Sequence, residues 1–172
     1  MAEETKQVFE LRKVYIKDMS FESPMAPNIF KNPDATPTID VQLNIGHDDL
    51  GDNMFESILV VTVNGKLHEK DAFLAEVHQA GVYEISGISR NEALGAALEV
   101  TCPNMLFPFA REAINELIVR GGFPQLLLSP VNFQSLYLQR ARNEAADSQS
   151  DQTTAADDGP AAAEAKADRT SS

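Results

Sequence analysis

Residues 39–45 read IDVQLNI, and this stretch decides the fold because apolar and polar side chains alternate along it without interruption. Successive side chains of a β-strand point to opposite faces, so a two-residue period predicts a strand that is buried on one face and solvated on the other. The predicted buried side consists of Ile39, Val41, Leu43 and Ile45. The chain is therefore expected to contain a sheet with one wet face.

The same alternation extends to three more segments, at residues 8–22, 54–67 and about 72–86. The polar links GHDDLGDN and HEKD join the last three strands, and short links of this kind favour antiparallel hairpins. The expected result is a four-stranded antiparallel sheet. Residues 21–37 hold four prolines, so we expect a long crossover loop there.

The first strand is the least regular of the four. Its inward side is predicted to be formed by Phe9, Leu11, Tyr15, Met19 and Phe21. Val14 and Ile16 then fall on the polar side, where single exposed apolar groups are ordinary. In the third strand, Glu56 is predicted to lie on the solvated side.

Helices are expected only after the strands, which predicts an α+β fold with the helices packed on the apolar face of the sheet. A short helix is expected at residues 90–98. The main helix is predicted to start with Pro108 in its first turn and to end at Arg120, before two glycines. Its apolar side chains cover more than one stripe, which indicates a second apolar neighbour besides the sheet. A last helix is expected from Ser129 to about Arg142.

Composition divides the chain into one domain at residues 1–142 and a tail at residues 143–172. The tail is acidic and rich in alanine, and it contains no aromatic residue, leucine, isoleucine or valine. Such a segment buries too little apolar area to offset the entropy lost on folding, so we expect it to be disordered.

The charge and the cysteine count exclude several classes of protein. A net charge of −12 repels nucleic acid and favours a basic partner. No apolar run is long enough for membrane insertion, and the polar, acidic N-terminus does not resemble a secretory signal. With a single cysteine the chain forms no internal disulfide, so we expect a cytoplasmic protein.

The motifs of common cofactor and metal sites are missing from the sequence. Neither a phosphate-binding GxxxxGK[ST] loop nor a GxGxxG turn occurs. The histidines His47, His68 and His78 are far apart and lack a ligand partner at metal-binding spacing. We therefore expect no cofactor and no metal.

The lone cysteine lies in the stretch TCPNMLFPFA at residues 101–110. A thiol near a helix start can be an activated nucleophile, so a small hydrolase that uses Cys102 is one hypothesis. The other interpretation is a small buried packing residue, which we favour because no base can be assigned to it. A non-catalytic oligomeric scaffold is a further alternative.

Apolar side chains also occur in connections where a minimal fold does not require them. They include Pro24, Met25, Ile29 and Phe30 in the crossover loop, and Phe123 and Leu126 between the helices. Packing within the monomer is one interpretation. The other is a groove for apolar peptides, because adaptable methionine and aromatic surfaces suit such ligands.

Four segments resemble those of the bacterial export chaperones of the SecB family. They read VYIKDMSFESPMAPNIF, FLAEVHQAGVYEISGI, CPNMLFPFARE and RGGFPQLLLSPVNF, and the likeness spans about residues 7–140. The resemblance implies a homotetramer, a dimer of dimers, that holds unfolded precursor proteins without ATP and delivers them to the translocase ATPase SecA. It implies no enzymatic activity.

The resemblance also implies roles for particular residues. SecA is expected to contact Asp18, Glu22, Leu74 and Glu76. The groove for unfolded clients is expected to include Pro24, Met25, Ile29, Phe30, Phe123, Leu126, Phe133, Leu136 and Tyr137. The resemblance implies that subunits meet at Ala75, Val77 and Gln79, and the second apolar side of the predicted main helix adds Ala113 and Leu117 to the expected contacts. The chain departs from the family by lacking a crossover-loop tryptophan and by one extra residue within KNPDATP.

Overall fold

A computed structural model describes residues 7–32, 34–88 and 92–153. It divides the chain into two units, residues 1–137 and 138–172, and the first contains the sheet and most of the helices. The four strands are β1 (Val8–Glu22), β2 (Thr38–Gly51), β3 (Met54–Leu67) and β4 (Lys70–Ser86). The helical segments are η1 (Asn28–Lys31), α1 (Glu92–Ala96), η2 (Ala97–Thr101), α2 (Cys102–Arg120) and α3 (Phe133–Thr153).

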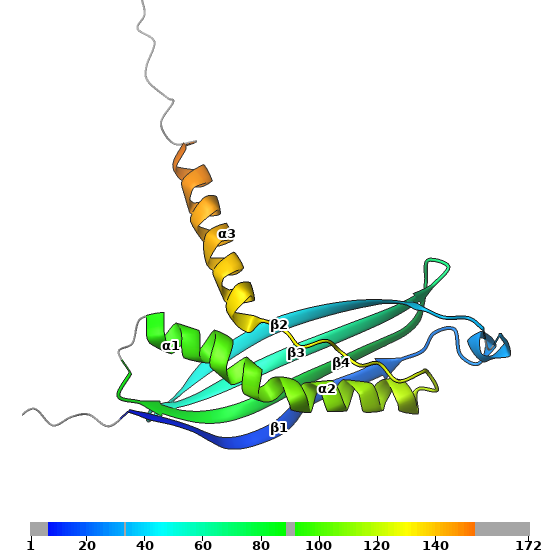
Figure 1. Cartoon of the computed structure of the whole chain (residues 1–172), viewed down its shortest axis with the longest axis horizontal. Coiled ribbons are helices and arrows are strands. Elements are labelled where there is room, and N and C mark those ends of the chain that lie inside the picture. Colours follow the sequence, from blue (N-terminus) through cyan, green and yellow to red (C-terminus); the bar gives the residue numbers. More distant parts are fainter. Residues whose placement is uncertain (1–6, 33, 89–91, 154–172) are drawn as a thin grey trace, which may run out of the picture. The chain divides into compact units, whose positions relative to one another are not determined.

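The strands form one antiparallel sheet in the order β1-β4-β3-β2 (Figure 1). The predicted hairpins join β2 to β3 and β3 to β4, while the crossover loop carries the chain from β1 to the opposite edge. The α+β architecture predicted from the alternating sequence is confirmed. Inside the crossover loop, the structure adds the single 3₁₀ turn η1, whose Ile29 is buried.

Two β-bulges correct the prediction for the first strand. The register between β1 and β4 shifts between Leu11 and Lys13 and again between Ile16 and Asp18. An extra residue reverses which face the next side chain occupies. Between the bulges, Val14 and Ile16 therefore face the helices, and Tyr15 faces the outer side of the sheet, opposite to the predicted arrangement.

The helix after the sheet starts earlier than predicted. Segments α1, η2 and α2 follow one another without a break along one face of the sheet (Figure 1). Pro103 occupies the first turn of α2, and Pro108 lies inside the helix, so the predicted start at Pro108 is wrong. Five residues of the π-helical segment η2 precede Cys102. The observed end at Arg120 agrees with the prediction.

The core lies between α2 and the two central strands. On α2, the buried residues Leu106, Ala110, Ile114 and Ile118 are spaced four apart and form one stripe. This stripe covers the inward side chains of β3 and β4, which include Leu59, Val61, Val63, Phe73, Ala75 and Val77. The hydroxyl of Tyr83 donates to the carbonyl of Cys102 at 3.1 Å and ties the sheet to the start of α2.

Helix α3 begins at Phe133 rather than at Ser129. The amide of Ser135 donates to Oδ1 of Asn132 at 3.0 Å, so Asn132 is the residue that caps the helix. The helix continues past the predicted end at Arg142 to Thr153, into the segment that was expected to be disordered. No proline or glycine interrupts the chain before Gly159, which permits this extension. Residues 154–172 of the predicted tail lie outside the described residues.

Candidate binding surfaces

The outer face of the sheet brings together the four residues that the resemblance assigned to SecA. In the strand register, Glu22 of β1 pairs with Leu74 of β4, and Ser20 pairs with Glu76. Asp18 pairs with His78 in the next row. Since alternate residues of β4 share a face, Asp18, Glu22, Leu74 and Glu76 lie on one surface, which we call the acidic face.

Glu76 is held at both carboxylate oxygens. The hydroxyl of Thr62 on β3 donates to Oε2 at 2.8 Å, and Nε2 of His78 lies 2.8 Å from Oε1. The hydrogen bond with His78, followed by that from Thr62, lowers the pKa of Glu76. The carboxylate is thus fixed in place and kept charged.

A second carboxylate on the outer side of the sheet is almost fully buried. Glu56 of β3 accepts hydrogen bonds from the hydroxyl of Tyr15 and, at 2.7 Å, from Nζ of Lys17. Both donors come from β1, so their side chains reach across β4 and leave Ala80 with no exposed area. The predicted position of Glu56 on the outer side is correct, but its side chain is only 8% exposed.

The helix side of the sheet is only partly covered. A helix with its side chains is about 10–12 Å wide and strands are about 4.8 Å apart, so one helix covers roughly two strands. Helix α2 packs mainly over β4 and β3. On β2, Ile39 and Val41 consequently remain 38% and 40% exposed although they face the helix side.

These uncovered residues form one wall of an apolar groove along β2. One hollow of about 180 Å³ lies between Ile39 and the segment from Phe123 to Leu126, and another lies between Val41, Leu43 and the segment from Leu128 to Val131. We call both together the β2 groove. Sequence reasoning placed Ile39, Val41 and Leu43 in the core and missed this role.

The opposite wall of the β2 groove is anchored at several points. The amide of Leu126 donates to Oδ1 of Asn115 on α2 at 3.0 Å. The ring of Phe123 packs on Phe73 and Phe30, with centroids 4.6 and 5.6 Å apart. Because Phe123 is only 8% exposed, it mostly supports the wall and offers little free surface.

The nine predicted groove residues do not form one continuous surface. Phe123 and Leu126 line the β2 groove. Ile29 and Phe133 are buried, and Phe133 packs against Phe107 at a centroid distance of 6.0 Å. Leu136 and Tyr137 are half-buried, whereas Phe30 is 48% exposed.

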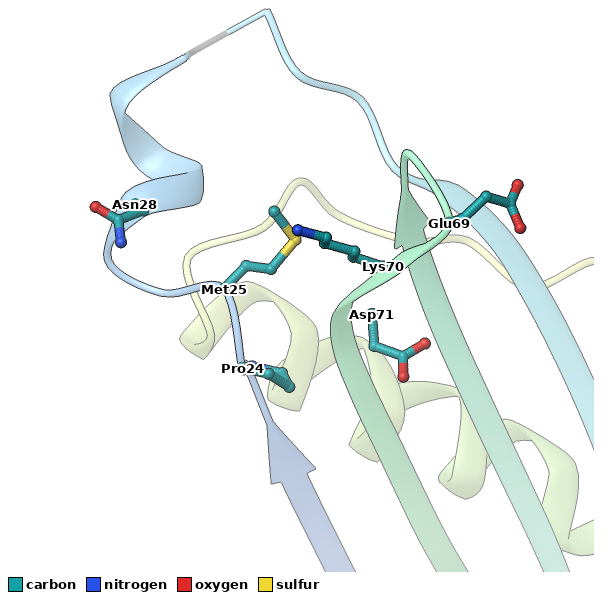
Figure 2. Close-up of a pocket in the computed structure, with 6 residues that line it drawn as sticks. All are labelled: Pro24, Met25, Asn28, Glu69, Lys70 and Asp71. Carbon is teal, nitrogen blue, oxygen red and sulfur yellow. The ribbon is translucent and has the colours of Figure 1, made fainter.

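Pro24 and Met25 line a separate hollow at one end of the sheet (Figure 2). It lies between the crossover loop and the turn that joins β3 to β4, and its other residues are Asn28, Glu69, Lys70 and Asp71. Figure 2 shows Met25 and Lys70 extending into the space between loop and turn, while Glu69 points away. Its charged rim distinguishes this hollow from the β2 groove.

The residues expected at subunit contacts occupy two different environments. Ala75 and Val77 have no exposed area and Gln79 is 3% exposed, so they can act on a partner chain only through the elements that cover them. Nε2 of Gln79 donates to the carbonyl of Tyr15 at 2.8 Å. Ala113 and Leu117 are half-buried.

An apolar strip lies beside Ala113, on the other side of α2 from the β2 groove. Ala113 lines a hollow with Ile16 of β1 and Phe109 of α2, which are 45% and 46% exposed. Met19 of the same edge strand is 51% exposed. We call Ile16, Met19 and Phe109 the β1–α2 strip.

Cys102 is fully buried. Burial raises the pKa of its thiol to about 12, so the thiol is protonated at neutral pH. This environment favours the packing interpretation over a nucleophile.

Among the described residues, no group of His, Cys, Asp and Glu side chains is arranged to hold a metal ion. None of the helices in the described ranges is long and apolar enough to span a bilayer.

Comparisons with known proteins agree on one family. The family model for the preprotein translocase subunit SecB matches residues 2–144. The protein-export protein SecB of Halorhodospira halophila is 47% identical over 135 residues, which cover 78% of this chain and 77% of the relative. The corresponding protein of Dechloromonas aromatica is 43% identical over 145 residues, or 84% of this chain and 94% of its own.

A solved structure shares the fold. It is a SecB-like chaperone of Mycobacterium tuberculosis in complex with a peptide from an antitoxin, with a TM-score of 0.61 at 20% identity. The match covers 72% of this chain and 90% of that chaperone.

Proposed function

Because this chain belongs to the SecB family of protein-export chaperones, we propose that it is an ATP-independent holdase of the cytoplasm. In this proposal it binds unfolded precursor proteins in the β2 groove and delivers them to the translocase ATPase SecA. No catalytic step is involved. The observation that carries the proposal is the row of apolar side chains that β2 presents without a covering helix.

The β2 groove suits capture of unfolded chains by many weak contacts. Each apolar side chain removed from water contributes about 1.5–3 kcal/mol before the cost of ordering the client. Several such subsites on one polypeptide add up through avidity. Since the groove binds the unfolded state alone, it shifts the folding equilibrium by mass action and needs no nucleotide.

Delivery to SecA is proposed to use the acidic face. Glu22 pairs with Leu74 there, Glu76 is the next residue on the same face of β4, and Asp18 lies one row further along. This row of acidic side chains with one apolar residue suits a Lys- and Arg-rich partner with some apolar surface. Such a contact weakens with salt because the charges are exposed.

The proposed oligomer is a homotetramer formed as a dimer of dimers. The β1–α2 strip supports it, because Ile16 and Met19 on the edge strand β1 and Phe109 on α2 are exposed apolar side chains. A second copy of the chain is the occupant proposed for this strip. Ala75 and Val77 lie beneath α2 and would affect assembly by setting the position of that helix.

Light scattering of a refolding secretory precursor tests the holdase function. The wild-type protein is expected to suppress aggregation when tetramer and precursor are equimolar. Val41→Asp, which puts a charge into the β2 groove, is expected to lose most of this suppression. Gln42→Asp is the matched control because Gln42 lies next in β2 on the opposite face of the sheet. Unchanged aggregation in the presence of wild-type protein would remove the proposal.

Charge reversal tests the SecA assignment separately. Asp18→Lys combined with Glu76→Lys is expected to weaken SecA binding and to leave precursor capture intact. Binding measured in low salt is the readout, since ionic contacts are strongest there. SecA affinity equal to that of the wild type would refute the role of the acidic face.

A further inference from the structure

Glu76 differs from the other acidic residues of the acidic face because Thr62 of the neighbouring strand β3 and His78 of its own strand hold it in place. In the register across the sheet, Glu76 of β4 lies between Ser20 of β1 and Thr62 of β3. Thr62 donates to one oxygen at 2.8 Å, and His78 contacts the other oxygen at 2.8 Å. Two separate side chains thus define one orientation of this carboxylate.

Such an arrangement prepares Glu76 for an incoming cation. A glutamate that is free in solution loses up to about 1.5–2 kcal/mol of rotamer entropy when it is immobilised. Thr62 and His78 impose this ordering before any partner arrives, and preorganisation of this kind increases affinity.

We propose that Thr62 and His78 are positioning residues that hold Glu76 for a Lys- and Arg-rich segment of SecA, and that protonation of His78 weakens this docking. The inference rests on the docking function proposed above and adds two residues and a pH dependence to it.

The effect of pH follows from the groups that surround His78. Asp18 faces it from β1, Glu76 lies two residues away on β4, and Val60 faces it from β3. Two further charges on the outer side of the sheet, Lys17 and Glu56, are paired with each other. A protonated His78 therefore brings a positive charge to Glu76 and Asp18 and competes with the cationic partner. Docking should therefore weaken as the pH falls and His78 becomes protonated.

Calorimetric titration of the full-length protein with SecA tests the proposal at about pH 8 and about pH 6, two values within the range in which histidine side chains generally change charge. Thr62→Val keeps the shape of the side chain and removes the hydroxyl. It is expected to weaken SecA binding about two- to tenfold at both pH values, the effect of losing one hydrogen bond. Thr62→Ser should restore the affinity.

The second variant, His78→Gln, keeps a donor for Glu76 but does not titrate. It is expected to bind SecA like the wild type at the higher pH and to lose the weakening at the lower pH. His47→Gln is the matched control, since His47 is an exposed histidine on β2, away from the acidic face, and its variant should keep the wild-type pH dependence.

Three outcomes overturn the proposal while leaving the docking function intact: Thr62→Val binding as tightly as the wild type, His78→Gln keeping the pH dependence, or a wild type that shows none. A wild-type protein that does not bind SecA at either pH in low salt refutes the docking function itself, and the positioning role with it. Precursor capture and urea unfolding, measured in parallel, are expected to be the same for all variants.

Discussion

Glu56 shows how a charged residue is accommodated on the outer side of this sheet. Burial alone raises the pKa of Glu56, but the hydrogen bonds from Lys17 and Tyr15 outweigh that effect and lower it below its ordinary value of 4.5. The ionised carboxylate therefore stabilises the fold. In return, the carboxylate raises the pKa of Tyr15 to about 12.

Replacement of this carboxylate has a pH-dependent effect on stability. Glu56→Gln is expected to lower the free energy of unfolding at neutral pH by about 1.5–3 kcal/mol, the range for hydrogen bonds to a charged group. A carboxyl group whose pKa is lowered by folding stabilises the folded state at pH values above the pKa that it has in the unfolded chain. This contribution is lost as the pH falls through the pKa of the folded state. The difference between variant and wild type should therefore shrink below about pH 4.5.

Urea unfolding at neutral and acidic pH measures this difference. The control is Glu10→Gln, because the side chain of Glu10 is 54% exposed and its ion pair with Arg12 is a surface pair. A constant difference between Glu56→Gln and wild type across the pH range contradicts a role for the ionised carboxylate.

Cys102 provides a second test at the level of single residues. With its pKa raised from 9.0 to about 12, the thiol has roughly a thousandfold less thiolate than an ordinary cysteine, and thiolate is the reactive form. A thiol reagent such as dithionitrobenzoate should therefore react with Cys102 only after unfolding in guanidinium. Cys102→Ala should still suppress precursor aggregation. Rapid labelling of the native protein would show that the cysteine is accessible.

Among the elements, β1 shows what the sequence could and could not predict. Its bounds, residues 8–22, were predicted from alternation, and the structure has the same bounds. The predicted faces of Val14, Tyr15 and Ile16 are wrong. In the sequence, a bulge appears only as an irregularity in the two-residue alternation. Val14 and Ile16 were that irregularity. Two apolar residues on a polar face were interpreted as ordinary exposed groups, whereas the structure shows that they accompany a register shift.

The helices were harder to predict because local signals competed. Pro108 suits a first turn by its fixed φ, yet it lies inside α2, where it cannot donate a backbone hydrogen bond. Burial of Cys102 and Leu106 against the sheet favours an earlier start, and that packing is invisible in the sequence. The β2 groove was missed for a related reason: alternation in β2 identifies a face but does not say whether a helix covers it.

Two strand glycines give a matched test of packing within the sheet. A Cβ at Gly65 of β3 would overlap the ring of Phe73, whereas a Cβ at Gly46 of β2 would meet nothing within 4 Å. Gly65→Ala is therefore expected to lower the free energy of unfolding by about 1–3 kcal/mol, the usual cost of overpacking a core. Gly46→Ala should be neutral or slightly stabilising. Equal effects in thermal or urea unfolding would contradict the packing of Phe73 on Gly65.

For the whole molecule, the decisive feature is that the apolar face of the sheet is larger than the area that α2 covers. Four strands present more apolar surface than α2 can cover, so the helix side keeps two exposed regions, the β2 groove and the β1–α2 strip. The two regions lie on opposite sides of α2. In the function proposed above, the β2 groove binds clients while a second copy of the chain covers the β1–α2 strip, so assembly leaves the binding surface free.

The oligomer that we propose uses the β1–α2 strip and leaves the β2 groove free. Ile16→Asp and Phe109→Asp each place a charge where we propose that a second chain packs, and burial of an unpaired charge is strongly unfavourable. Both variants are expected to dissociate to smaller species while each chain stays folded, because these side chains are 45% and 46% exposed within one chain. Light scattering coupled to size-exclusion chromatography measures the mass, and circular dichroism monitors the fold. Val41→Asp, in the β2 groove, should keep the wild-type mass. A tetramer that withstands both changes in the strip would place the subunit contacts elsewhere.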